Sequence, residues 1–168
     1  MALPPLSSSG VFTSTASIRI DAPREKVWEA LLDFDSYKEC RGQILVTPSG
    51  AKLDGPPAVD ALIKMEPVHL PPTMGDPAFM GSQSALVRII ALDHENYRAA
   101  WVTASMPKWA LFAERWQTLT VEDGITKYES VEVFSGILAY VVKWFVGKAL
   151  DQGMMAMAEG LKSRCENA

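Results

Sequence analysis

Two glutamates near the end of the chain stand at positions where they could move a proton to or from a bound molecule. The segments Leu111–Val121 and Ile125–Phe134 are rich in β-branched and aromatic residues and flank Glu122–Asp123–Gly124. This pattern predicts a β-hairpin. If the three intervening residues form the turn, Glu114 faces Glu132 across the two strands. Burial and mutual repulsion of two carboxylates raise the pKa of one of them, which can then donate a proton at neutral pH.

A shorter turn gives a second pairing that the sequence also allows. If the dipeptide Asp123–Gly124 alone forms the turn, Arg115 lies opposite Glu132 as an ordinary ion pair, and the other glutamate moves to the opposite face. We favour the three-residue turn because it directs Lys127 and Glu129 to solvent.

Two further side chains could take part in proton transfer. Tyr128 shares the expected inner face of its strand with Glu132. His69 lies in the proline-rich segment Pro67–Ser82, where a histidine could act as a general base or simply be exposed. The sequence shows no nucleophile beside a base and no glycine-rich phosphate loop. Any reaction is therefore expected to need no cofactor.

Bulky apolar side chains are the candidates for contact with a ligand. Five Trp and eight Met are many for 168 residues, and such side chains often line adaptable pockets. The candidates are Phe34, Tyr37, Ile63, Met65, His69, Trp101, Met106, Trp109, Phe112, Trp116, Phe134, Tyr140 and Trp144. Core packing uses the same residue types, and Trp28 is expected to be plain core between a helix and the sheet.

Composition excludes several classes of protein. The net charge is -4 and no run of Lys and Arg appears, which argues against nucleic acid as a partner. Cys40 and Cys165 have no metal-ligand spacing, and His69 and His94 are isolated, so no metal site is expected. No apolar run reaches the roughly 20 residues that an integral membrane segment needs. The N-terminus does not read as a secretory signal, so a cytoplasmic protein, monomer or homodimer, is expected.

The chain reads as one domain, 11–164, between a disordered tail at 1–10 and a short tail at 165–168. Hydrophobic periodicity predicts an α+β protein. The expected strands are Val11–Ile20, Gln43–Thr47, Val59–Glu66, Ser84–Leu92, Tyr97–Ser105 and the two strands of the hairpin above, with two short helices after the first strand, ending near Asp33 and Cys40. The segment Pro67–Ser82 is expected to be a long loop, and such loops are often lids.

The longest segment without proline predicts one long C-terminal helix, Ser135–Arg164. Ser135 is placed to cap its first turn. Near its start the apolar side is unusually wide, so the helix is expected to lie against a large concave surface.

The chain resembles the START/Bet v 1-like superfamily (SRPBCC), in particular its polyketide cyclase/dehydrase and lipid-transport group. The likeness is strongest in IDAPREKVWEALLDFDSY, Ile20–Tyr37, and in FSG, Phe134–Gly136, before the long helix; it covers Val11–Leu161. It implies a helix-grip fold, a seven-stranded antiparallel sheet curled around the C-terminal helix, with an internal hydrophobic cavity that opens near the loops and the start of that helix. The sequence departs from its relatives at Cys40, where they often carry an aromatic residue, and in its longer proline-rich loop.

Three functions follow from this resemblance. The first is a carrier or binding protein for a hydrophobic small molecule such as a polyketide, a terpenoid or a lipid. The second is a polyketide cyclase/dehydrase-type enzyme of secondary metabolism, in which Glu114, Glu132 or Tyr128 moves a proton. The third is a protein-interaction domain.

Overall fold

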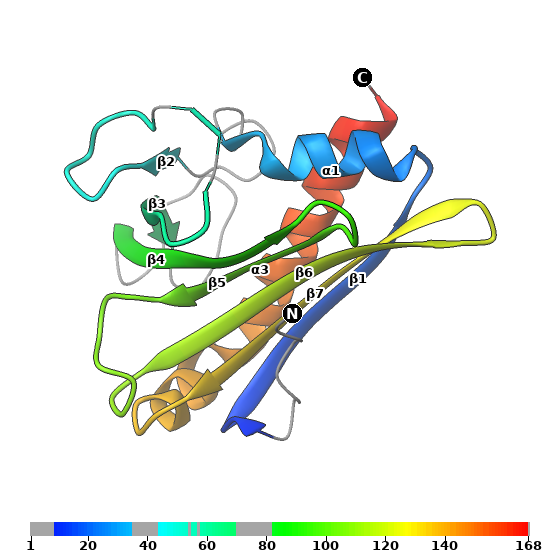
Figure 1. Cartoon of the computed structure of the whole chain (residues 1–168). Helices are drawn as coiled ribbons and strands as arrows, with labels where there is room; N and C mark the ends of the chain where they lie inside the picture. The colour runs from blue at the N-terminus through cyan, green and yellow to red at the C-terminus, as the bar shows by residue number, and fades with distance from the viewer. Residues whose placement is uncertain (1–8, 35–43, 54, 57, 70–81, 168) are drawn as a thin grey trace.

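The computed structural model describes residues 9–34, 44–53, 55–56, 58–69 and 82–167 (Figure 1). In these ranges the chain forms seven strands and two helices. In chain order they are β1 (Phe12–Ile20), α1 (Arg24–Leu32), β2 (Ile44–Val46), β3 (Leu62–His69), β4 (Ser82–Asp93), β5 (Arg98–Thr103), β6 (Phe112–Glu122), β7 (Ile125–Ser135) and α3 (Ala139–Glu166). The expected second short helix, which includes Tyr37 and Cys40, lies outside the described residues.

A single antiparallel sheet has the strand order β1-β7-β6-β5-β4-β3-β2, and α3 lies across one face of it (Figure 1). β1 pairs with β7, so the first strand lies beside the strand that leads into α3. Close backbone contact between α3 and the described part of the sheet is concentrated on β1, with less on β7. The expected helix-grip α+β architecture is confirmed.

The turn between β6 and β7 contains two residues. Asp123 and Gly124 have φ angles of 53° and 78°. Two successive positive φ angles define the type I′ turn, whose twist matches that of the flanking strands. Arg115 therefore pairs with Glu132. The favoured pairing of Glu114 with Glu132 is wrong, because the Asp-Gly dipeptide completes the tighter turn without the residue before it.

This shift of one residue exchanges the two faces of β6. Arg115 points toward α3, where its Nη1 lies 3.9 Å from Sδ of Met157. Phe112, Glu114 and Trp116 alternate with it and therefore point to the opposite face. There the indole Nε1 of Trp116 donates to Oε1 of Glu114 at 2.8 Å. The favoured three-residue turn would have placed Phe112 opposite Phe134, Glu114 opposite Glu132 and Trp116 opposite Ser130, all on the face of Glu132. That placement is wrong, because a slip of one residue reverses every side chain of a strand.

Just before α3, the backbone at Gly136 packs closely against the loop between β5 and β6. Gly136 has a φ of 92°, and a Cβ at this position would lie 2.6 Å from the carbonyl oxygen of Ala110. The backbone N–H groups of Ile137 and Leu138 donate to the carbonyls of Trp109 and Ala110, at 3.1 and 2.9 Å. The helix therefore begins only at Ala139.

Ser135 does not cap the helix, contrary to the prediction. It is the last residue of β7, and its hydroxyl donates to the carbonyl of Phe112 at 3.4 Å. At its other end α3 continues beyond Arg164 to Glu166, and Cys165 is buried.

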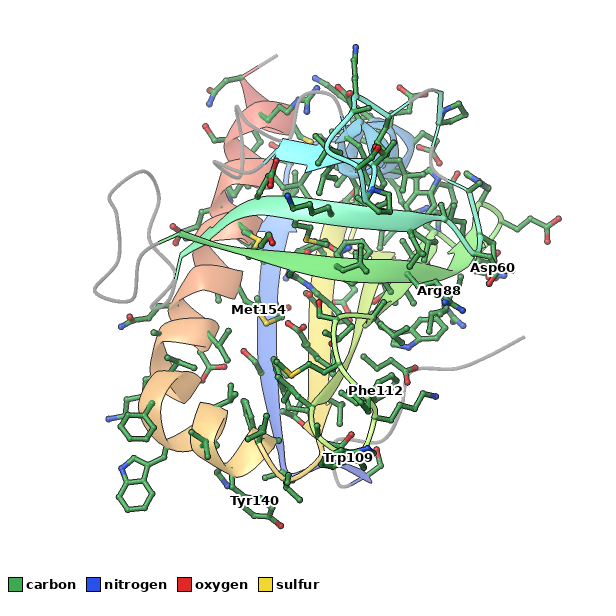
Figure 2. All side chains as sticks on the ribbon, turned by 90° about the vertical axis from the view of Figure 1, so that its left-hand side faces the viewer. Asp60, Arg88, Trp109, Phe112, Tyr140 and Met154 are labelled. Atoms are coloured by element: carbon green, nitrogen blue, oxygen red, sulfur yellow. The ribbon has the colours of Figure 1, made fainter. Side chains whose placement is uncertain are left out.

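The two halves of α3 differ in burial. Met154, Ala158 and Leu161, in the second half, are buried against the sheet and α1. In the first half Ala139 is buried, but Trp144 is 87% and Phe145 78% exposed. The expectation that the wide apolar side of the helix start lies against a concave surface is wrong, because the sheet covers only the side of the helix that carries Ala139 and Leu150. Figure 2 shows this end of the helix, with Tyr140 labelled, beside the lower end of the sheet.

β3 lies further along the chain than expected. Asp60 has a φ of 67°, which interrupts extended backbone, and the strand starts at Leu62. It continues through Pro67 to His69, because the register shifts between Met65 and Val68 and a bulge tolerates the missing N–H. The loop is therefore not entered at Pro67, and residues 70–81 lie outside the described part of the chain.

Among the residues that the structure describes, three clusters of buried apolar side chains lie on the α3 side of the sheet. The first packs α1, with Trp28, and the second half of α3 onto β1, β6 and β7. The second joins Phe34, which follows α1, to β2–β5 and includes Trp101. The third lies at the start of α3 and includes Phe134. These clusters leave the middle of the α3-facing surface to other side chains.

Candidate functional site

A group of polar side chains lies between the three apolar clusters on the surface that faces α3. We call it the central polar group; its members are Ser14 of β1, Arg115 and Gln117 of β6, and Tyr128, Ser130 and Glu132 of β7. The cross-strand register brings them together, since Glu132 pairs with both Ser14 and Arg115, and Ser130 pairs with Gln117. Ser14, Gln117, Tyr128 and Ser130 are fully buried, and Arg115 is 6% exposed.

Several hydrogen bonds orient the group. Arg115 donates from Nε to the hydroxyl of Ser130 at 3.0 Å, and its guanidinium carbon lies 5.7 Å from the ring centre of Trp101. The hydroxyl of Tyr128 donates to Oε1 of Gln117 at 2.7 Å. The planar guanidinium is thus oriented by the bond to Ser130 together with the indole of Trp101.

Two buried donors of this group have no partner within the described part of the chain. These are Nη2 of Arg115 and Nε2 of Gln117. Leaving a buried donor unpaired costs about 1–3 kcal/mol, and more for a charged group. Both are N–H donors, so the missing partner is a hydrogen-bond acceptor.

Glu132 supplies a carboxyl group next to these donors. Burial raises its pKa, while the positive charge of Arg115 acts in the opposite direction. A carboxyl with a raised pKa keeps its proton at a higher pH than usual, so it can donate that proton to a bound molecule.

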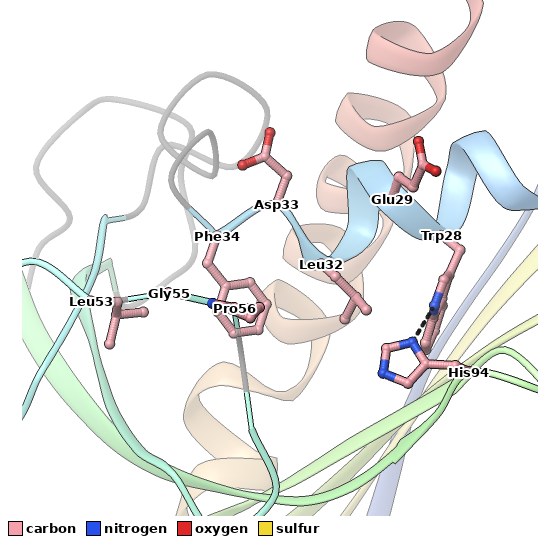
Figure 3. A pocket seen from close by; sticks show the side chains of 9 residues that line it. All are labelled: Trp28, Glu29, Leu32, Asp33, Phe34, Leu53, Gly55, Pro56 and His94. Carbon is pink, nitrogen blue, oxygen red and sulfur yellow. Dashed lines mark hydrogen bonds between the residues drawn. The ribbon is translucent and has the colours of Figure 1, made fainter.

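A separate pocket of about 580 Å³ lies at the end of α1 (Figure 3). It is lined by Trp28, Glu29, Leu32, Asp33, Phe34, Leu53, Gly55, Pro56 and His94. The indole of Trp28 donates to Nδ1 of His94 at 3.1 Å, so this tryptophan borders the pocket as well as the core. Asp33 is engaged by Arg164. Three of its polar side chains, Trp28, His94 and Asp33, are thus already engaged, whereas the central polar group holds two buried donors without a partner among the described residues.

The fold matches solved structures over nearly the whole chain. Ara h 8.0201, a Bet v 1 homologue, has a TM-score of 0.69 at 13% identity, and the match covers 95% of this chain and 100% of that one. The hypothetical protein jhp0584 from Helicobacter pylori also has a TM-score of 0.69 at 13% identity, covering 98% and 97%. The chain has the Bet v 1-like helix-grip fold. The protein TTHA0849 from Thermus thermophilus shares this fold, with a TM-score of 0.64 at 16% identity over 91% and 96% of the two chains.

One curated relative of this Bet v 1-like chain is similar in sequence along almost its whole length. It is the oxopyrrolidines biosynthesis cluster protein O of Penicillium oxalicum, which is 27% identical over 98% of this chain and 90% of its own. No protein-family model matches the chain. In the described part, no helix is long and apolar enough to cross a membrane, and no three His, Cys, Asp or Glu side chains gather as they would around a metal ion.

The Bet v 1-like fold divides the predicted ligand contacts into groups. Those on the α3-facing side, or packed against it, are Phe34, Ile63, Met65, Trp101, Tyr128, Glu132 and Phe134. Those on the opposite face of β6 are Phe112, Glu114 and Trp116, and those exposed at one end of the molecule are Met106, Trp109, Tyr140 and Trp144. Tyr37 and the side chain of His69 lie outside what the structure describes.

Sequence reasoning missed four members of the central polar group, namely Ser14, Arg115, Gln117 and Ser130. The signal that could have found the two on β6 is the Asp123–Gly124 dipeptide, the strongest short hairpin signal, which favours the two-residue turn.

Proposed function

We propose that this protein binds a largely apolar small molecule that carries a hydrogen-bond acceptor, on the α3-facing side of the sheet, as a binding protein or carrier. The observation that carries the proposal is the pair of unpartnered buried donors in the described part of the chain, Nη2 of Arg115 and Nε2 of Gln117. A ligand that supplies an acceptor to these donors removes the cost of leaving them unpaired, and the surrounding apolar clusters suit the rest of the molecule.

Glu132 adds a carboxyl group beside these donors. It pairs with Arg115 across the strands and keeps some accessible surface, so a ligand bound at the two donors can also contact it. Burial raises the pKa of this carboxyl, which favours the protonated form as a further hydrogen-bond donor to the same ligand.

The relative from Penicillium oxalicum supports a role in secondary metabolism. An oxopyrrolidine bears a ring carbonyl, whose oxygen is a hydrogen-bond acceptor of the kind that the unpartnered donors lack. The ligand class is therefore an apolar molecule with a carbonyl or enolate oxygen, such as an oxopyrrolidine or a polyketide.

The test compares two probes of similar shape, an N-alkyl pyrrolidinone and the alkyl cyclopentane with the same chain. Quenching of tryptophan fluorescence reports binding, because Trp101 lies beside Arg115. The pyrrolidinone should bind roughly tenfold or more tightly than the cyclopentane, as expected for a hydrogen bond to a charged donor. Equal affinities, or binding of neither probe, would overturn the proposal.

Variants of two arginines locate the site. Arg115→Met should remove the preference for the pyrrolidinone and leave binding of the cyclopentane within a few fold. Arg88→Met is the matched control, because Arg88 is exposed on the opposite face of the sheet, as its label in Figure 2 shows. A preference that survives Arg115→Met, or that Arg88→Met also abolishes, would contradict the assignment.

The raised pKa of Glu132 favours a second candidate function, proton transfer to or from the bound carbonyl compound. Glu132 would protonate the carbonyl oxygen while the adjacent carbon loses its proton to water, giving an enol. Deuterium exchange at that carbon, followed by NMR for a bound alkyl diketone, measures this reaction. Glu132→Gln should abolish the acceleration and leave binding within a few fold, whereas Glu114→Gln on the other face should retain it. Exchange that is no faster with the protein than in buffer would exclude the enzyme.

A further inference from the structure

A surface rich in exposed aromatic residues lies at one end of the molecule. It consists of the loop between β5 and β6 and the start of α3, and we call it the aromatic end. Its exposed apolar residues are Met106, Trp109, Ile137, Leu138, Tyr140, Val141, Trp144 and Phe145. Trp144 is 87%, Phe145 78%, Trp109 70% and Tyr140 67% exposed. Isolated exposed apolar residues are ordinary, but a contiguous group of this kind marks an interaction surface.

The two segments of the aromatic end are held together by backbone hydrogen bonds. Ile137 and Leu138 donate to the carbonyls of Trp109 and Ala110, and Gly136 packs directly against Ala110. Trp109 and Tyr140 consequently lie at the same end of the molecule, at the bottom of Figure 2. Along α3, Tyr140 and Trp144 are one turn apart, as are Val141 and Phe145, so they form one stripe. The surface is therefore presented by a rigid frame.

The charged residues within the two segments of this surface are all lysines, and the next acidic residue along α3, Asp151, accepts a hydrogen bond from Ser14. Lys108, Lys143 and Lys148 are exposed, and Lys148 continues the stripe one turn beyond Trp144. The segments 104–113 and 133–150, which form the surface, contain these three lysines and no Asp or Glu, in a chain with a net charge of -4. A positively charged surface on a chain of net negative charge favours an anionic partner.

We propose that the aromatic end docks on the surface of a phospholipid bilayer that contains anionic headgroups. Trp and Tyr favour the boundary between water and lipid, where an apolar ring and a polar edge are both satisfied. Lysines beside them pair with anionic headgroups while their aliphatic stems lie along the apolar surface. A second copy of the chain fits less well, because a symmetric dimer through this surface brings the lysines of both copies together with no carboxylate opposite. This inference does not depend on the proposed ligand.

Flotation with phosphatidylcholine vesicles, with and without phosphatidylserine, tests the proposal. The protein should float with the vesicles that contain phosphatidylserine, and binding should weaken as salt is added. Trp144→Ser combined with Phe145→Ser should lower partitioning by roughly tenfold or more. Lys143→Gln combined with Lys148→Gln should lower partitioning into the anionic vesicles by about tenfold and leave the neutral vesicles unaffected.

A matched control removes two exposed apolar side chains elsewhere. Val59 and Val121 are 51% and 52% exposed and lie outside the aromatic end, so Val59→Ser combined with Val121→Ser should float like the wild type. The four residues replaced at the aromatic end are exposed, and thermal unfolding will verify that their variants remain folded. Equal binding to both kinds of vesicle, flotation that the Trp144/Phe145 variant retains, or a dimer that this variant dissociates without any vesicle binding would each overturn the proposal.

Discussion

Arg115 and Glu132 lie opposite one another across β6 and β7, on the face of the sheet that α3 covers. The guanidinium bonds through Nε to Ser130 and leaves Nη2 without a partner among the described residues, while burial raises the pKa of Glu132. A cation and a titratable acid thus lie together on the covered face of the sheet. Such a pair is costly for folding and useful for recognising a polar ligand atom.

The side chains of Arg115 and Glu132 should contribute more to ligand binding than to the free energy of unfolding. We expect Glu132→Leu alone to destabilise the fold by about 3–5 kcal/mol, since it leaves Arg115 buried without its opposing carboxyl. Combining it with Arg115→Met should restore or exceed wild-type stability, by up to about 4 kcal/mol, and abolish binding of the pyrrolidinone. Urea unfolding and fluorescence titration measure the two effects. A double variant less stable than the single one would show that the pair stabilises the fold.

Stability should depend on pH through Glu132. Its raised pKa means that the folded protein holds this proton more tightly than the unfolded chain, in which a glutamate titrates near 4.5. The contribution to stability is therefore fully present below pH 4.5 and is lost as the pH rises through the pKa of the folded state. Relative to Glu132→Gln, the wild type should become less stable as the pH rises. Urea midpoints over a pH series test this, and a difference that stays constant with pH would refute it.

Substitution of Gly136 by alanine should destabilise the fold more than the same substitution at another glycine with a positive φ. Gly136→Ala places a Cβ against the carbonyl of Ala110, whereas Gly50 has a φ of 87° with nothing within 4 Å. Gly50→Ala should therefore cost about 1–2 kcal/mol from backbone conformation alone. Gly136→Ala should cost more, because the backbone that orients the start of α3 must also move. Thermal unfolding of the two variants gives the comparison. Equal losses of stability would mean that the loop between β5 and β6 moves away from the added Cβ at no cost in free energy.

Cysteine pairs can report the register of β6 and β7 in solution. Thr118 pairs with Glu129 in the structure, whereas a three-residue turn would place it opposite Tyr128. Thr118→Cys with Glu129→Cys should form a cross-link on mild oxidation, seen by mass spectrometry, and Thr118→Cys with Tyr128→Cys should not. The reverse result would restore the pairing of Glu114 with Glu132.

Much of the fold follows from local sequence patterns. Alternating polar and apolar residues predict β1 and β7 with bounds close to those observed, and helical periodicity predicts α3. Of the central polar group, Tyr128 and Glu132 could be predicted to share a face from the sequence alone. Both lie on β7, where alternate side chains point to the same face. Arg115 and Gln117 were not, because their face depends on how β6 pairs with β7.

The sequence alone determined the succession of elements and the antiparallel sheet, because the patterns that specify them lie within a few residues of each other. Tertiary structure decided which side chains of β6 face α3, since the φ angles of Asp123 and Gly124 set the register and one residue of slip reverses the strand. It also decided that Trp144 and Phe145 are exposed, because whether an apolar stripe is covered depends on which other elements pack against that side of the helix.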